Sequence, residues 1–199
     1  TSFTMELSGT WSRVERNGVT ASVTGTLQDG PNVVSFDNVA TIQERSAYRY
    51  VSMVHNHAKD VLPTFTGMDF QLPTNVDVTG GTCNAFYDGS SINFYVEGGD
   101  CFSMANISEV VWHEYGHGIN DNFYQDNGGF FQNGGMGEGY ADFWAFSLSE
   151  DPIMAEGYNM LTPNEPIRRY DVDRKIYPVD LSGEVHADGE IIAGAWWDT

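Results

Sequence analysis

The residues best suited to chemistry form one short motif, His113-Glu114-Tyr115-Gly116-His117. On a helix, residues four apart lie on the same face, so the two imidazoles can bind one metal ion. Glu114 is adjacent to the first histidine and can reach a water molecule on that ion, where a carboxylate acts as a general base. Because so short a motif also arises by chance, it does not establish a metal site alone.

A third ligand candidate follows after a glycine-rich loop. Glu138 lies in the segment Gly137-Glu-Gly-Tyr-Ala-Asp142. Two antiparallel helices joined by a loop would bring Glu138 to the same ion. Two imidazoles and one carboxylate leave the fourth zinc position open, as in catalytic sites. Asp142 lies one turn later and is placed to accept a hydrogen bond from a ligating imidazole.

The motif must be carried by a helix, and the sequence predicts one over residues 107–119. Asn106 is a favourable N-cap, and Glu109 stands three residues later as its capping-box partner. The apolar side chains of this segment recur at helical spacing: Ile107, Val110, Val111 and Tyr115.

The remaining elements predict an α+β fold. Residues 1–40 are expected to form strands, with a two-residue alternation from Val19 to Leu27, and a second β region covers 75–97 with a turn at 87–92. Further helices are predicted over residues 43–60, 136–148 and from about His186 onward. The chain ends inside that last predicted helix, which leads us to expect a longer protein.

Charge and length exclude several classes of protein. The 199 residues include nine Lys and Arg and 28 Asp and Glu, for a formal charge of −19. Such a field repels phosphate, which argues against a nucleic-acid partner. No apolar run approaches the ~18 residues of a membrane span, so no membrane partner is expected. No leader with a basic and an apolar region opens the sequence, so for an exported protein we expect the leader to have been removed.

Two cysteines, Cys83 and Cys101, flank an apparent hairpin. We predict a disulfide between them, because zinc-type spacing such as C-x-x-C is absent. The alternative is a pair of buried free thiols in a cytosolic protein.

Three motifs in order resemble the gluzincin metallopeptidases, specifically their fungalysin-like branch and, more distantly, the thermolysin-like enzymes. They are HEYGHGI with GGMGEGYADF, the segment from Cys83 to Tyr87 followed by Asp-Gly-Ser, and the segment from Gly183 to Glu190. The resemblance runs from about Tyr48 to Thr199, whereas residues 1–40 match nothing recognisable.

The resemblance implies a two-lobed zincin-type metallopeptidase. Its β-rich N-terminal lobe would carry the active-site helix, and its C-terminal helical lobe is apparently incomplete. Residues 1–40 would be the β-rich N-terminal segment of the upper lobe. Residues 41–121 would complete that lobe with an edge strand and the metal-binding helix. Residues 122–199 would begin the lower lobe, with the third zinc ligand and a second catalytic histidine.

The resemblance also implies roles for the metal-site residues. His113, His117 and Glu138 would bind one catalytic zinc ion. Glu114 would act as general base on the metal-activated water and then carry its proton to the leaving amine. His186 would donate a hydrogen bond to the oxyanion of the tetrahedral intermediate.

Peptide binding is implied by the same resemblance. Arg168 would hold a substrate carbonyl, with Arg169 an equally close candidate. Asn84 and the backbone of Ala85 would pair with an extended peptide as an added strand. An apolar residue directly after the cut is the family's expected preference.

One departure concerns the oxyanion. The thermolysin-like pattern has a tyrosine between the second histidine and the glutamate, and residues 127–131 contain none. Tyr124 or Tyr140 would have to substitute, or His186 would act alone.

Some residues have two readings. Glu109, with Glu150 and Asp151 as companions, could bind a structural calcium ion, as could Glu97 with Asp100. The alternative is a capping residue and solvated acidic turns. His55 and His57 are read as ordinary surface or boundary histidines rather than ligands.

Together these patterns predict a secreted zinc-dependent endopeptidase. The first alternative is a catalytically incomplete or scaffold fragment of such an enzyme, which needs a further C-terminal segment or a partner chain. A weaker alternative is a metal-dependent hydrolase whose substrate is not a peptide.

Overall fold

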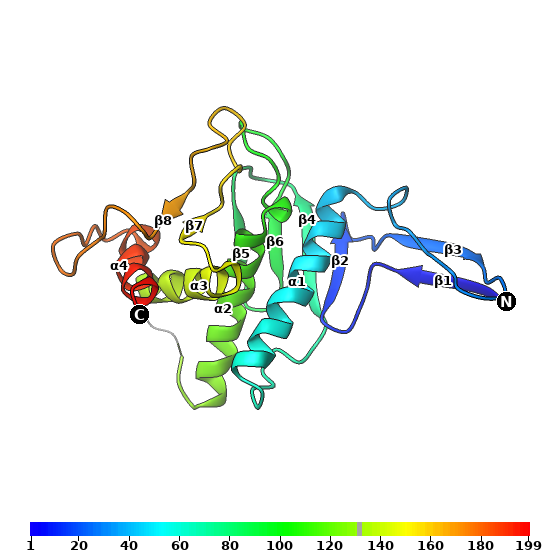
Figure 1. Cartoon of the computed structure of the whole chain (residues 1–199), viewed down its shortest axis with the longest axis horizontal. Coiled ribbons are helices and arrows are strands. Elements are labelled where there is room, and N and C mark those ends of the chain that lie inside the picture. Colours follow the sequence, from blue (N-terminus) through cyan, green and yellow to red (C-terminus); the bar gives the residue numbers. More distant parts are fainter. Residues whose placement is uncertain (131–132) are drawn as a thin grey trace.

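The structure, a computed structural model, describes residues 1–130 and 133–199. The segment 127–131, in which the expected tyrosine is missing, therefore includes one residue, Phe131, that lies outside the described residues. The architecture is α+β, as predicted, with one mixed sheet, two small antiparallel pairs of strands and helices packed beside them (Figure 1).

The central sheet has four strands in the order β2-β4-β6-β5. Strand β4 (Leu72–Val78) pairs in parallel with β2 (Ser12–Arg16) and β6 (Ile92–Tyr95). Strand β5 (Ala85–Tyr87) is antiparallel to β6 and lies at the edge. The hairpin predicted between the two cysteines is thus confirmed, and its outer strand is left with one unpaired side.

Two helices pack against this sheet. Helix α1 (Ile42–Val61) begins with a complete capping box between Thr41 and Glu44. Helix α2 (Ser108–Asp126) follows a short 3-10 turn, η1 (Met104–Asn106), and packs against α1. Apolar residues of both helices form the core with side chains of the sheet: Val51, Val54, Tyr115, Ile119, Leu72, Ile92 and Phe94.

The second half of the chain is built on two further helices. Helix α3 (Gly134–Ser149) packs on α2, and α4 (Val185–Trp197) packs on α3. The segment of chain between α3 and α4 contains two short strands, β7 (Ile153–Met154) and β8 (Arg168–Arg169), which pair with each other in antiparallel fashion. All four predicted helices are therefore present, and the end of the helix predicted over 107–119 is the boundary that differs most.

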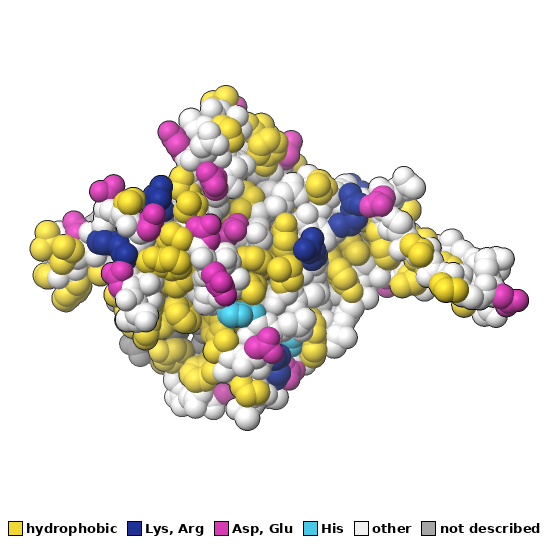
Figure 2. All heavy atoms as spheres, viewed as in Figure 1, with side chains coloured by type: hydrophobic (Ala, Val, Ile, Leu, Met, Phe, Trp, Pro, Cys, Tyr) yellow, Lys and Arg dark blue, Asp and Glu magenta, His cyan; other side chains and the backbone are white. Residues whose placement is uncertain are grey.

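The first residues form a separate ribbon. Strands β1 (Ser2–Glu6) and β3 (Ser22–Thr26) pair with each other and extend away from the helices (Figure 1). Acidic side chains are spread over the face in Figure 2, whereas Lys and Arg gather at a few places. No helix within residues 1–130 and 133–199 has the length and apolar character that a bilayer crossing needs.

Three predictions about local structure were wrong. Asn106 closes the 3-10 turn, so Ile107 is the N-cap residue of α2 and offers no side-chain hydrogen bond. The helix also continues to Asp126, because the first glycine after it is Gly128. His55 is not a surface or boundary residue: it is 1% exposed, stacks on Trp11 and shares a 2.8 Å hydrogen bond with Tyr115.

Candidate metal centre

The metal-ligand candidates come from two helices that pack very closely. His113, Glu114 and His117 lie on α2, and Glu138 lies in the first turns of α3. A Cβ on Gly116 would lie 3.1 Å from the Cα of Ala141, so a larger residue at position 116 would have to move the two helices apart by a few tenths of an ångström. This close approach brings a carboxylate of α3 to the imidazoles of α2.

The three ligand atoms form a compact triangle. The Nε2 atoms of His113 and His117 are 3.1 Å apart. Glu138 places Oε2 at 3.2 Å from Nε2 of His113 and Oε1 at 3.7 Å from Nε2 of His117. Ligands ~2.0–2.2 Å from a tetrahedral zinc ion lie roughly 3.3–3.5 Å from one another. The spacing therefore suits a single zinc-sized ion.

The hydrogen bonding also fits a cation at this place. Oε2 of Glu138 is buried and accepts no hydrogen bond, although buried carboxylate oxygens are normally paired. Among the described residues, these three form the only group of three or more His, Cys, Asp or Glu side chains able to share an ion. Two imidazoles and one carboxylate are a donor set that zinc accepts.

Asp142 holds the outer nitrogen of His113. Its Oδ1 lies 2.6 Å from Nδ1 of the imidazole, which turns Nε2 toward the other ligands. Arg168 donates two hydrogen bonds to the same carboxylate, and the Tyr170 hydroxyl donates a third. Burial opposes the charge of Asp142, but Arg168 and His113 lower its pKa well below its usual range. The carboxylate is therefore ionised.

The carboxylates also act on His113 itself. Burial lowers its pKa, but Asp142 and Glu138 more than offset this and raise it to about 10. A metal ion must displace that proton, so metal binding at this centre weakens in acid.

Glu114 is placed beside the ligands. It is 5% exposed and lines the main cavity. Burial raises its pKa, the charges of His113 and His117 oppose that rise, and Glu138 adds to it. A buried carboxylate with a raised pKa is the form expected of a group that accepts and returns a proton.

His186 reaches the centre from α4. Its Nδ1 lies 2.7 Å from Oε1 of Glu184, and its Nε2 lies 3.6 Å from Oε2 of Glu138. Glu184 is also the N-cap of α4, since it accepts a hydrogen bond from the backbone of Ala187. The residue that starts the helix thus also orients the histidine.

The ligands border a cavity of about 950 Å³. Edge strand β5 forms part of its wall through Asn84, Ala85 and Tyr87, and Arg168 and His186 also line it. The structure thus brings all the predicted catalytic, metal and substrate-binding residues to one cavity or its immediate border.

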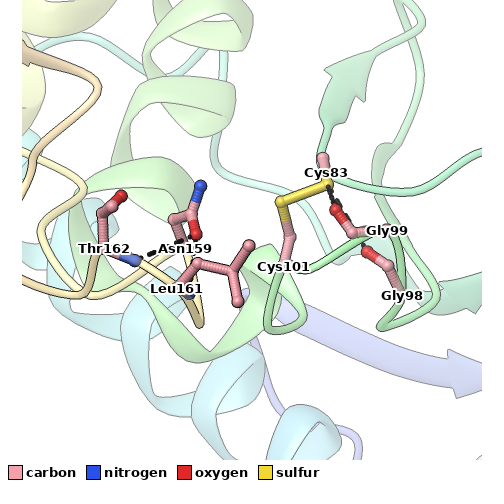
Figure 3. The surroundings of a disulfide bond; sticks show 7 residues. All are labelled: Cys83, Gly98, Gly99, Cys101, Asn159, Leu161 and Thr162. Carbon is pink, nitrogen blue, oxygen red and sulfur yellow. Dashed lines mark hydrogen bonds between the residues drawn. A yellow bond between two sulfur atoms is a disulfide. The ribbon is translucent and has the colours of Figure 1, made fainter.

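The predicted disulfide is present and stands at one end of this cavity. Cys83, directly before Asn84, is joined to Cys101 (Figure 3). The backbone of Cys101 pairs with that of Asn159, in the loop after β7, as an isolated antiparallel β-bridge. The backbone N–H of Phe102 donates a hydrogen bond to the carbonyl of Tyr158 in the same loop. Through Cys101, the disulfide therefore connects the start of β5 to a loop that lines the cavity with Tyr158 and Asn159.

Other predicted candidates lie elsewhere. Arg169 is on the outer side of β8 and forms an exposed ion pair with Asp171, so Arg168 is the arginine of the site. Tyr124 and Tyr140 are not among the residues that line the cavity.

Several cavity residues were not assigned by sequence reasoning, among them Asp121, Tyr87 and Tyr158. Tyr87 belongs to the edge-strand motif and could have been included from its position. Tyr158 reaches the cavity through the contacts of its loop with Cys101 and Phe102, and no pattern in the sequence signals it.

The calcium predictions are not tested by this structure. Glu109 lies with Glu156 on a smaller cavity of about 380 Å³, while Glu150 is the C-cap residue of α3. Calcium at Glu109 and Glu150, or at Glu97 and Asp100, stays a prediction.

Comparison with known proteins gives a relationship at the level of the fold. No family model and no curated protein matches the sequence. A solved structure described as the precursor of protealysin, a metalloproteinase from Serratia proteamaculans, superimposes with a TM-score of 0.55 at 16% identity. The alignment covers 74% of this chain and 49% of that one, so this chain spans about half the length of that protein. The shared feature is the fold.

Proposed function

We propose that this protein is a zinc-dependent endopeptidase of the fungalysin-like gluzincin type. The observation that carries the proposal is the group His113, His117 and Glu138, whose ligand atoms all lie within 4.8 Å of one another beside Glu114. The fold shared with a metalloproteinase precursor supports the same reading.

The zinc ligands and Glu114 divide the chemistry. His113, His117 and Glu138 would hold the zinc ion, which when bound would supply Lewis-acid polarisation of the scissile carbonyl and lower the pKa of a water molecule. Glu114 takes a proton from the attacking water and gives it to the leaving amine. Burial of Glu114 keeps its carboxylate out of bulk solvent, where it would lose basicity to hydration.

His186 stabilises the charge that develops on the carbonyl oxygen. Its Nδ1 is held by Glu184, which directs Nε2 toward the metal ligands. Donors of this kind contribute roughly 2.7–4 kcal/mol to transition-state stabilisation. Arg168 donates two of its five N–H groups to Asp142 and supports the orientation of His113 through that carboxylate. Its remaining N–H groups would hold a substrate carbonyl, the role implied by the family resemblance.

The substrate is an extended peptide. Strand β5 is an edge strand that lines the cavity, and an added strand would satisfy its open side. The same edge favours peptides over other hydrolysable compounds. The disulfide next to it is stable in an oxidising compartment, which favours a secreted protein.

The alternative is a scaffold or incomplete fragment that needs a further segment or a partner chain. It has one favourable observation, the coverage of 49% of the protealysin precursor. The two proposals differ in whether this chain, loaded with zinc, hydrolyses peptide bonds.

The test is cleavage of an unfolded protein such as casein by the zinc-loaded chain, with and without a zinc chelator. Glu114→Gln serves as the matched variant, because it keeps the size of the side chain and all three ligands. Cleavage that requires both zinc and Glu114 is the expected result. One bound zinc with no cleavage would instead support the scaffold alternative.

A further inference from the structure

The two ends of the main cavity differ in chemistry. The N-terminal half of α2 contributes the apolar side chain of Val110 to the wall, and Met154 and Ile167 add further apolar lining. Toward the C-terminal half the wall carries Asp121 and the ring of Tyr87. A peptide lying along the cavity would therefore meet an apolar wall at one end and a carboxylate at the other.

The position of Asp121 follows from the helix. It lies four residues after His117, so the two side chains share a face about 6 Å apart along the axis. One residue of an extended peptide covers about 3.3 Å. Asp121 is therefore about two peptide residues from the metal ligands.

Tyr87 belongs to the same end of the cavity. A Cβ on Gly118 would meet its ring at 3.5 Å, which places Tyr87 over the second half of α2. Burial, and after it the negative charge of Asp121, raises the pKa of Tyr87 to about 12. The ring and the carboxylate are thus close neighbours.

Asp121 has no cationic partner of its own. None of the ion pairs among residues 1–130 and 133–199 includes it. The positive group on the opposite side of the cavity, Arg168, is already neutralised by Asp142. A carboxylate that contacts the neighbouring tyrosine and forms no ion pair among the described residues suits a long cationic side chain, whose stem packs on the ring while its head meets the charge.

We propose that Asp121 and Tyr87 form a subsite for a Lys or Arg side chain of the substrate, two residues before the scissile bond. The inference rests on the proposed peptidase function. We take the substrate peptide to pair with β5 in antiparallel fashion, the commoner arrangement of neighbouring strands, and this choice fixes the direction of the peptide in the cavity. A peptide antiparallel to β5 has the residues that precede the cut beside Tyr87 and those that follow it beside Asn84.

The test compares fluorogenic peptides that differ at that one position, with Arg, Gln or Glu. For the zinc-loaded wild type we expect kcat/KM about fivefold higher for Arg than for Gln, the effect of one partly exposed ion pair. Asp121→Asn should bring the two substrates within a factor of two. Asp126→Asn, which removes the same charge from an exposed position on the same helix, should leave the preference intact.

Binding provides a second readout that does not depend on turnover. Zinc-loaded Glu114→Gln should bind the Arg peptide more tightly than the Gln peptide, and adding Asp121→Asn should remove the difference. Cleavage without any preference for Arg, or a preference unchanged by Asp121→Asn, would overturn the subsite alone. A wild type that cleaves none of the peptides would overturn the peptidase function itself.

Discussion

Arg168 meets the carboxylate of Asp142 through two parallel hydrogen bonds, 2.7 Å from Nε to Oδ2 and 2.8 Å from Nη2 to Oδ1. The same carboxylate holds Nδ1 of His113. Arg168 therefore contacts the candidate metal centre indirectly, through the carboxylate of Asp142 and then the imidazole of His113.

From these contacts we predict that Asp142→Asn weakens zinc binding by roughly 10- to 100-fold, as the loss of a carboxylate that supports a ligating histidine does in other zinc proteins. The ring of His113 would lose its charged partner, and Arg168 would be left buried beside a neutral amide. Competition with a zinc chelator measures the change. Asp126→Asn is the control for the loss of one negative charge and should bind zinc like the wild type. If the zinc affinity of Asp126→Asn falls as far as that of Asp142→Asn, the argument is refuted.

Close packing of α3 on α4 gives a second prediction. A Cβ on Gly139 would lie 2.6 Å from the carbonyl oxygen of Gly189 and would also collide with Ile192. We expect Gly139→Ala to lower the free energy of unfolding by about 1–3 kcal/mol, the usual effect of overpacking. Urea denaturation measures it.

Gly129→Ala is the matched control, because the nearest atom to its new Cβ is 3.6 Å away. Peptide hydrolysis by Gly139→Ala should fall more than zinc binding does, since α4 carries His186 but no metal ligand. Equal stability of the two variants would show that the helices tolerate a wider separation.

The disulfide gives a third prediction. Replacing both Cys83 and Cys101 by alanine should lower the free energy of unfolding by about 3 kcal/mol, because the bridge closes a loop of 18 residues in the unfolded chain. Since Asn84 follows Cys83 directly, KM for peptides should rise more than kcat falls. A variant of unchanged stability would mean that the bridge constrains little in the unfolded state.

His55 should make stability depend on pH. Burial lowers its pKa from the usual 6.5, Asp69 opposes that shift, and Lys59 adds to it. A histidine held neutral in the folded state binds its proton more readily when unfolded. The free energy of unfolding should therefore fall as pH drops below 6.5 and keep falling until the folded pKa is passed.

The comparison is between wild type and His55→Gln, both saturated with zinc, in urea titrations from pH 7.5 to pH 5.5. The variant should be less stable at pH 7.5, because its side chain cannot reproduce the stacking on Trp11 and the bond to Tyr115. Its stability should also change less with pH. Parallel curves would show that His55 does not carry the dependence.

The sequence predicts that His113, His117 and Glu138 lie together and that Asp142 contacts an imidazole, but it does not predict the bond of Arg168 to Asp142, for a physical reason. His113 and His117 are four residues apart on one helix, so local geometry alone places them together. Glu138 needed only the further assumption of an antiparallel helix pair. The grip of Arg168 on Asp142 depends on the pairing of β7 with β8, two strands of two residues each, which have no periodic signal.

Local rules also competed with one another. Asn106 has the side chain of a helix cap, yet the backbone of residues 104–106 forms a 3-10 turn and moves the cap to Ile107. His55 was read from its polarity, whereas tertiary contacts with Trp11 and Tyr115 decide its burial. Such contacts join residues far apart in the chain, and a single sequence does not reveal them.

Stepwise addition of zinc to the metal-free protein, with peptide hydrolysis and bound zinc followed together, tests the central claim most directly. Hydrolysis should rise in proportion to zinc and stop at one ion per chain, while Glu114→Gln should bind the same single ion and cleave nothing. Hydrolysis that is complete without zinc, or that persists in Glu114→Gln, would contradict the assignment of His113, His117, Glu138 and Glu114 to one catalytic centre.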